Sequence, residues 1–279
     1  MIYLPIIGSL LESAGIILEK KVLRRNGLNF KNYTTYEFLA IVLTMIPIMF
    51  FAWGIKPEAF RLANMLIFAL VVVVSIVANL LIFYSLKREN VTEFEPIWLM
   101  QSIFVIILAF ILFKSERNLL VFGLAMVASL ALIVAHVKKE HLVFDKYIVS
   151  ALLGSFLFAV ELILSKPILQ FYNPFTFYFL RCLGVFIICW ILFKPDGKDL
   201  DRKTEWTIIS IGLMWAFYRA IMYYGFENIG VIFTTMLFIL SAVFTFLFAV
   251  VFLKEKPTMR QIISTIVIVI CVVLSVVLK

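Results

Sequence analysis

Residues 8–23 of this chain read GSLLESAGIILEKKVL, and residues 154–169 read GSFLFAVELILSKPIL. At an offset of 146 residues, the second segment repeats the first at several identical positions. A second echo, at an offset of 139, relates FILFKSER (110–117) to AVVFLKEK (249–256). The identical pairs include Gly8 with Gly154, Ser9 with Ser155, Leu11 with Leu157, Ile17 with Ile163, Leu18 with Leu164, Lys20 with Lys166, Phe113 with Phe252 and Glu116 with Glu255.

Two hydrophobic halves that echo each other are typical of membrane transporters built from internal repeats. We expect the first half to cover residues 1–140 and the second to cover residues 141–279. In such transporters the substrate site lies where the halves meet, near the bilayer midplane.

The composition indicates a polytopic membrane protein. Of 279 residues, 64% are hydrophobic and 15% are charged, and the mean hydropathy is +1.08. A soluble domain is about half apolar and about a quarter charged, so this excess of apolar surface needs lipid to cover it. The net charge of +8 is explained by Lys and Arg in cytoplasmic loops, and we expect no nucleic-acid partner.

The apolar segments predict an all-α membrane protein with ten transmembrane helices. Crossing a hydrocarbon core of about 30 Å takes about 20 mostly apolar residues in a helix, and helices satisfy their own backbone hydrogen bonds in lipid. The predicted spans are 2–20, 35–53, 63–86, 94–113, 119–137, 147–169, 174–193, 206–226, 230–253 and 258–278.

The distribution of Lys and Arg predicts the orientation. Of 25 such residues, 17 fall in or beside the first, third, fifth, seventh and ninth loops, five fall on the other side, and three lie deeper within spans. The positive-inside rule therefore places the odd-numbered loops in the cytoplasm and both termini outside. Because five spans separate equivalent helices, the halves have opposite orientations, which makes a 5+5 inverted repeat.

Nothing in the sequence indicates a metal site, a cofactor or an enzyme. The three cysteines (Cys182, Cys189 and Cys271) lie in apolar segments without metal-ligand spacing. The two histidines, His136 and His141, lie at one loop end without acid clusters or a nucleophile motif. An integral membrane enzyme, such as a lipid transferase, is therefore disfavoured.

The two halves each end in a hairpin whose turn carries a phenylalanine followed by a glutamate and basic residues. The first turn reads Phe113-Lys114-Ser115-Glu116-Arg117, and the second reads Phe252-Leu253-Lys254-Glu255-Lys256, continued by Pro257-Thr258. This pattern resembles the ten-helix EamA-like members of the drug/metabolite transporter superfamily. The first turn departs from the family at Ser115, where a glycine or lysine is usual.

The first predicted helix also resembles that of the small multidrug resistance proteins. The matching residues are Glu12-Ser13-Ala14-Gly15, with Lys20 eight positions after the glutamate. The resemblance implies that protons and cationic substrates compete for Glu12.

Charged residues within the predicted spans are candidates for function. Each costs about 2.5–3.5 kcal/mol near a helix centre on insertion scales. Gly8, Glu12, Gly15 and Glu19 share one face of the first helix, with Glu19 at the inner edge. Glu161 lies on the equivalent stripe of the sixth helix, so we expect Glu12 and Glu161 to face each other near mid-depth. The other charges within spans that we take as candidates are Lys166, Arg181 and Arg219.

These charges also have structural interpretations. Glu161 could pair with Arg219, Arg181 or Lys166 in a buried salt network, because all three cations lie in the same half of the membrane. Arg181 and Lys166 could instead extend their head groups to the interface. Glu12 has no obvious cation at its own depth.

Aromatic residues offer walls for a substrate site. Trp215 and Arg219 share a stripe on the eighth predicted helix with Tyr218 one step round, and Trp98 and Gln101 offer a partner stripe on the fourth. Such rings bind organic cations through their π faces. Most of the other aromatic residues are expected to pack or to face lipid.

We interpret the chain as a secondary active transporter, because no nucleotide-binding motif is present. We expect a proton-coupled exporter of a small polar or zwitterionic metabolite, such as an amino acid, in the cytoplasmic membrane, acting as a monomer or homodimer. Glu12 would take a proton or a substrate ammonium group, and Arg219, with Arg181, would bind a carboxylate. The alternatives are a carrier of choline-like or lipophilic amines and a lipid-linked sugar flippase. The full set of candidate site residues is Glu12, Glu161, Arg219, Trp215, Tyr218, Trp98, Arg181 and Lys166.

Overall fold

The computed structural model describes residues 3–23, 28–88, 91–136, 145–195, 200–244, 247 and 258–278, and these are almost entirely helical. The all-α prediction is therefore confirmed for the described residues, and each predicted span overlaps one of the α-helices named below. The helices are α1 (Tyr3–Leu23), α2 (Phe30–Ala52), α3 (Leu62–Arg88), α4 (Val91–Leu112), α5 (Leu119–His136), α6 (Lys146–Leu169), α7 (Pro174–Phe193), α8 (Arg202–Asn228), α9 (Val231–Phe238) and α11 (Met259–Val277).

The ninth predicted span differs from the structure. We expected one continuous helix over 230–253, but α9 ends at Phe238 with Ile239 as its C-cap, and helix resumes over 240–244. The irregularity is confined to Ile239, which keeps right-handed helical dihedrals, and the apolar helix runs over Val231–Phe244. Residues 245–246 and 248–253 lie outside the described part of the chain.

Polar side chains start several of the helices. Asn29, Asp145, Asn173, Asp201 and Thr258 each accept a hydrogen bond from a backbone N–H in the first turn of the helix that follows. Such N-caps satisfy amide groups that have no partner within the helix. The helix boundaries therefore follow local sequence signals.

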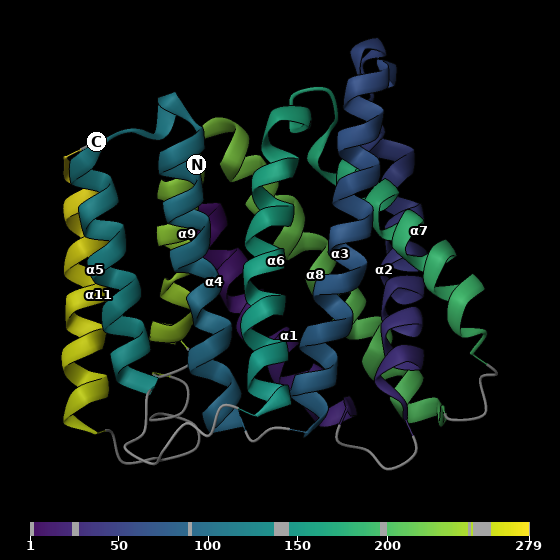
Figure 1. Cartoon of the computed structure of the whole chain (residues 1–279), viewed down its shortest axis with the longest axis horizontal. Helices are drawn as coiled ribbons and strands as arrows, with labels where there is room; N and C mark the ends of the chain where they lie inside the picture. The colour runs from purple at the N-terminus through teal and green to yellow at the C-terminus, as the bar shows by residue number, and fades with distance from the viewer. Residues whose placement is uncertain are drawn as a thin grey trace.

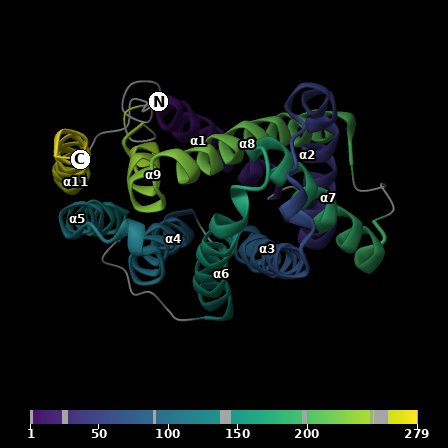
Figure 2. The same ribbon diagram turned by 90° about the horizontal axis from the view of Figure 1, so that it is seen from above.

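The helices stand side by side, and the start of α1 and the end of α11 lie on the same side of the bundle (Figure 1). Seen from above, α2 and α7 lie at one end, and α5 and α11 lie at the other (Figure 2). Helix α1 packs on α8, and α6 packs on α3, while α2 pairs with α7 and α5 pairs with α11.

Five of the described helices combine the length and apolar character of a membrane span: α2, α3, α6, α7 and α11. Helices α1 and α8 are long enough but carry several charges, including Glu12 and Glu19 on α1 and Arg219 on α8. Since lipid does not solvate such charges, these two helices must turn them toward the interior of the bundle.

A glycine allows α8 to pack directly against α2. A Cβ atom on Gly212 would lie 2.9 Å from the carbonyl carbon of Ala40 and from the backbone nitrogen of Ile41. Trp215 and Arg219 follow Gly212 at helical spacings of three and seven residues, which places them on the same face. The close approach therefore brings both side chains toward the interior beside α2.

Contacts between distant segments join the loops on the side where the chain ends lie (Figure 1). Ile55, after α2, forms an isolated bridge with Tyr172, after α6, and the Asn173 amide donates to the Gly54 carbonyl over 2.8 Å. In the turn between α4 and α5, Glu116 accepts hydrogen bonds from the first two backbone amides of α9, at 2.8 and 3.2 Å. The glutamate of the first hairpin motif thus caps α9.

We predict that Glu116→Ala lowers the free energy of unfolding by about 1–2 kcal/mol, because it leaves two amides at the start of α9 without their acceptor. Thermal unfolding of the detergent-solubilised protein measures the change. Glu58→Ala, in the turn before α3 on the same side, is the matched control. Equal stability of the two variants would contradict the capping role.

Candidate functional site

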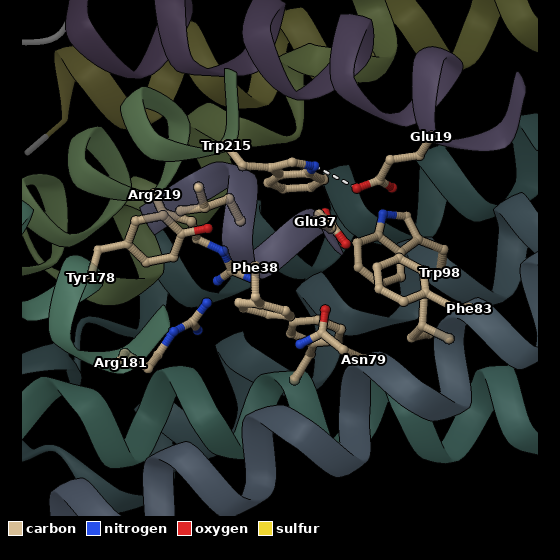
Figure 3. Close-up of a pocket in the computed structure, with 13 residues that line it drawn as sticks. Glu19, Glu37, Phe38, Asn79, Phe83, Trp98, Tyr178, Arg181, Trp215 and Arg219 are labelled. Atoms are coloured by element: carbon tan, nitrogen blue, oxygen red, sulfur yellow. Dashed lines mark hydrogen bonds between the residues drawn. The ribbon is translucent and has the colours of Figure 1, made fainter. Parts of the chain in front are cut away.

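A cavity at the centre of the bundle, which we call the central cavity, receives side chains from seven helices (Figure 3). Two arginines approach from one side and two glutamates approach from the other, and aromatic rings lie between them. Its lining includes Glu19, Glu37, Phe38, Asn79, Phe83, Trp98, Tyr178, Arg181, Trp215 and Arg219.

The arginine end is organised by one buried carboxylate. Arg181 Nη1 lies 2.7 Å from Glu161 Oε1, and Arg219 Nη1 lies 3.7 Å from Glu161 Oε2. The Tyr223 hydroxyl also donates to Glu161 Oε1, over 2.9 Å. All four side chains are buried. The expectation of a buried salt network around Glu161 is confirmed, and the alternative in which Arg181 extends to the interface is wrong because its side chain is 1% exposed.

Two guanidinium groups beside one carboxylate leave a surplus positive charge at this end of the cavity. Arg181 makes the short contact with Glu161. Arg219 lies farther from that carboxylate and is flanked by aromatic rings. Its guanidinium carbon is 5.3 Å from the ring centre of Phe158 and 5.7 Å from that of Tyr218. Arg219 is therefore the better placed of the two to bind an anionic group in the cavity.

The acidic end is formed by Glu19 of α1 and Glu37 of α2, which are 4% and 3% exposed. Their carboxyl groups lie close together in the cavity (Figure 3), and Trp215 Nε1 donates to Glu19 Oε1 over 2.5 Å. Sequence reasoning left Glu37 out, because it lies near the start of the predicted span 35–53. Helix α2 begins five residues earlier, at Phe30 after the Asn29 cap, and this places Glu37 two turns inside the helix. The cap was the signal that could have identified it.

Glu12 lies in a second, neighbouring cavity, which we call the side cavity. Tyr218 donates a hydrogen bond to Glu12 Oε1 over 2.9 Å, and Ser13 donates to the backbone carbonyl of Ser241, just beyond the interruption of α9. Trp98 borders both cavities. The lining of the side cavity includes Glu12, Trp98, Gln101, Ser102, Tyr218, Met222, Thr235 and Ser241.

The two stripes that were expected to face each other have different partners. Glu12 contacts Tyr218 on α8, whereas Glu161 contacts arginines on α7 and α8. Small residues do allow close packing on both stripes: a Cβ on Gly8 would meet the ring of Phe238, at 2.5 Å. A Cβ on Gly154 would likewise meet the side chain of Ile82 on α3, at 2.8 Å.

The remaining sequence candidates are distributed as follows. Trp215 and Arg219 line the central cavity, Tyr218 lines the side cavity, and Trp98 stands between the two. Lys166 lines neither of these cavities. Its ammonium group donates to the backbone carbonyl of Phe226, near the end of α8.

Comparison with known proteins agrees with this architecture. Residues 145–277 match the model of the EamA-like transporter family, so the resemblance to the drug/metabolite transporter superfamily is confirmed. The matched residues include the second hairpin motif, which follows the family pattern better than the first. Residues 252–257 of that motif lie outside the described part of the structure. The second half of the chain is thus similar to a family of membrane transporters.

One solved structure, titled only as the crystal structure of a protein, superposes on this chain with a TM-score of 0.72 at 15% sequence identity. The superposition covers 99% of this chain and 96% of the other. At this identity the likeness shows the shared fold alone. No curated protein matches the chain.

We predict that Glu161→Gln destabilises the protein by about 3–5 kcal/mol, because it leaves two buried guanidinium groups without their carboxylate. Arg181→Met should cost more stability than Arg219→Met, since Arg181 makes the shorter contact. Unfolding of the three purified variants, followed by tryptophan fluorescence, measures these differences. Lys166→Met, which alters a cation outside both cavities, is the control and should cost least.

Proposed function

From the EamA-like family of its second half, we propose that this protein is a secondary active transporter for a small zwitterionic metabolite, such as an amino acid. It works in the cytoplasmic membrane by alternating access, with both termini outside and with protons as the coupling ion. Export is the direction we propose.

The arrangement of charge in the central cavity carries the substrate proposal. The end near Arg219 has a surplus positive charge that suits a carboxylate, and the end with Glu19 and Glu37 suits an ammonium group. The rings of Trp98 and Trp215 between them suit an apolar or aromatic body. A purely apolar ligand would leave both charged ends without partners, at a cost in free energy.

The packing of the helices supports an inverted repeat with residues 1–140 and 141–279 as its halves. Under this repeat α1 corresponds to α6 and α3 corresponds to α8, and the contact of α1 with α8 has its counterpart in that of α6 with α3. Self-equivalent pairs, α2 with α7 and α5 with α11, hold the two halves together. Rocking of the halves about these contacts would expose the central cavity to each side in turn.

Glu12 is the residue we propose for proton coupling. Its carboxyl group accepts a hydrogen bond from the Tyr218 hydroxyl in the side cavity. The charged residues that we propose to bind the substrate line the neighbouring central cavity. A proton on Glu12 changes the charge beside α8, the helix that also carries Arg219.

The side cavity favours a second candidate function, transport of a choline-like or lipophilic amine. It holds the Glu12 carboxyl beside Trp98 and Tyr218 and contains no arginine among its lining residues. A carboxylate enclosed by aromatic rings suits an organic cation.

Three matched ligands separate these functions: phenylalanine, phenethylamine and 3-phenylpropanoate. We predict that phenylalanine raises the melting temperature of the detergent-solubilised protein most, because it alone has partners for both charged ends of the central cavity. Stabilisation by phenethylamine alone would select the amine carrier, and stabilisation by 3-phenylpropanoate alone would refute both functions.

We further predict that Glu12→Gln abolishes the dependence of uptake on a pH gradient in liposomes, while binding of the stabilising ligand is retained. The glutamine keeps the hydrogen bond from Tyr218 but cannot exchange a proton. Glu58→Gln is the control. Proton-driven transport at the wild-type rate in Glu12→Gln would remove Glu12 from the coupling mechanism.

A further inference from the structure

We propose that Glu19 and Glu37 form a carboxyl pair that holds one proton between them and binds the cationic group of a ligand with the single negative charge that remains. The site deepens the proposed function and rests on it for the identity of the transported ligand. Its proton and its charge follow from the contacts of the two side chains.

The closeness of the two carboxyl groups requires a proton. Glu19 and Glu37 are both buried and line the same cavity, where Figure 3 shows their carboxyl groups close together. Two ionised carboxylates would repel each other in a site that water does not screen. One of the two groups must therefore carry a proton.

The indole of Trp215 indicates where the proton lies. Trp215 Nε1 is a donor only, and it donates to Glu19 Oε1. That hydrogen bond stabilises the ionised form of Glu19, whereas Glu37 Oε2 has no donor. This assigns the proton to Glu37 and the negative charge to Glu19.

One oxygen of the pair is left for a ligand. Glu37 Oε2 is buried and has no hydrogen-bond partner, although Glu37 lines the central cavity, where Figure 3 shows its carboxyl group between Trp215 and Trp98. A buried oxygen without a hydrogen-bond partner destabilises the structure, and a donor group on a ligand would remove this cost. An ammonium group placed there would donate to Glu37 Oε2 and lie beside the charge of Glu19.

The other ionisable groups around the pair are consistent with a single negative charge. Arg219 of α8 and Arg181 of α7 act on it from the opposite end of the cavity, while Tyr33 of α2 and Cys182 of α7 are neutral neighbours. The arginines stabilise one negative charge on the pair. A second charge would repel the first at contact distance in a site that water does not screen.

The first test measures the proton without any ligand. Infrared spectroscopy of the detergent-solubilised full-length protein reports the C=O stretch of protonated carboxyl groups. We expect Glu37→Gln and Glu19→Gln each to remove one carboxyl signal, because each leaves a single glutamate that stays ionised and accepts from the new amide. Glu58→Gln should leave the signal unchanged. An unchanged C=O signal in both Glu37→Gln and Glu19→Gln would overturn the proposal that the pair holds a proton.

The second test measures the charge, with methylammonium chloride as the probe and potassium chloride at equal concentration as the salt control. Each single glutamine variant keeps one negative charge, so methylammonium should raise its melting temperature as it does that of the wild type. Glu19→Gln/Glu37→Gln should lose most of this stabilisation. The single variants also show whether glutamine at each position is compatible with folding.

Two outcomes would overturn the cation site: equal stabilisation of the double variant and the wild type, or no stabilisation of the wild type. These results are independent of the substrate proposal, because methylammonium has no carboxylate for Arg219. If methylammonium binds as expected and phenylalanine does not, the carboxyl pair stands and the zwitterionic substrate is wrong. If phenylalanine binds equally to the double variant, the pair is not its ammonium site.

Discussion

A charge that is buried in a lipid-covered bundle needs a partner within the protein, and Glu161 provides the clearest case. Its carboxylate lies on α6, and it contacts Arg181 from α7 and has Arg219 from α8 nearby. Loss of either charge would leave the other without compensation in a medium that does not solvate it. The interaction therefore ties three helices together and sets one end of the central cavity.

Helix α8 connects this cluster to the other buried acids. Tyr218 donates to Glu12, and Trp215 donates to Glu19, both on α1. The same helix approaches α2 closely at Gly212, beside the helix that carries Glu37. Residues of one helix thus line both the cavity with the arginines and the cavity with Glu12.

The outline of the fold could be predicted because its signals are local. Hydropathy located the spans, and side chains such as Asn173 and Asp201 marked helix starts. The buried network around Glu161 was also foreseen, as one of two interpretations. The irregularity at Ile239 was not, because residues 231–244 are mostly apolar and no proline or glycine marks it.

The sequence by itself determined that this chain is a helical membrane protein and which charged side chains must be placed inside it, because hydrophobicity and helix length are properties of each segment alone. Only the tertiary structure decided which of these charges meet. In the structure Glu12 contacts Tyr218, Glu161 contacts Arg181, and Glu19 lies in the same cavity as Glu37. Such pairings depend on how each helix is rotated and how closely its neighbours approach, and those quantities are set by packing among many helices at once.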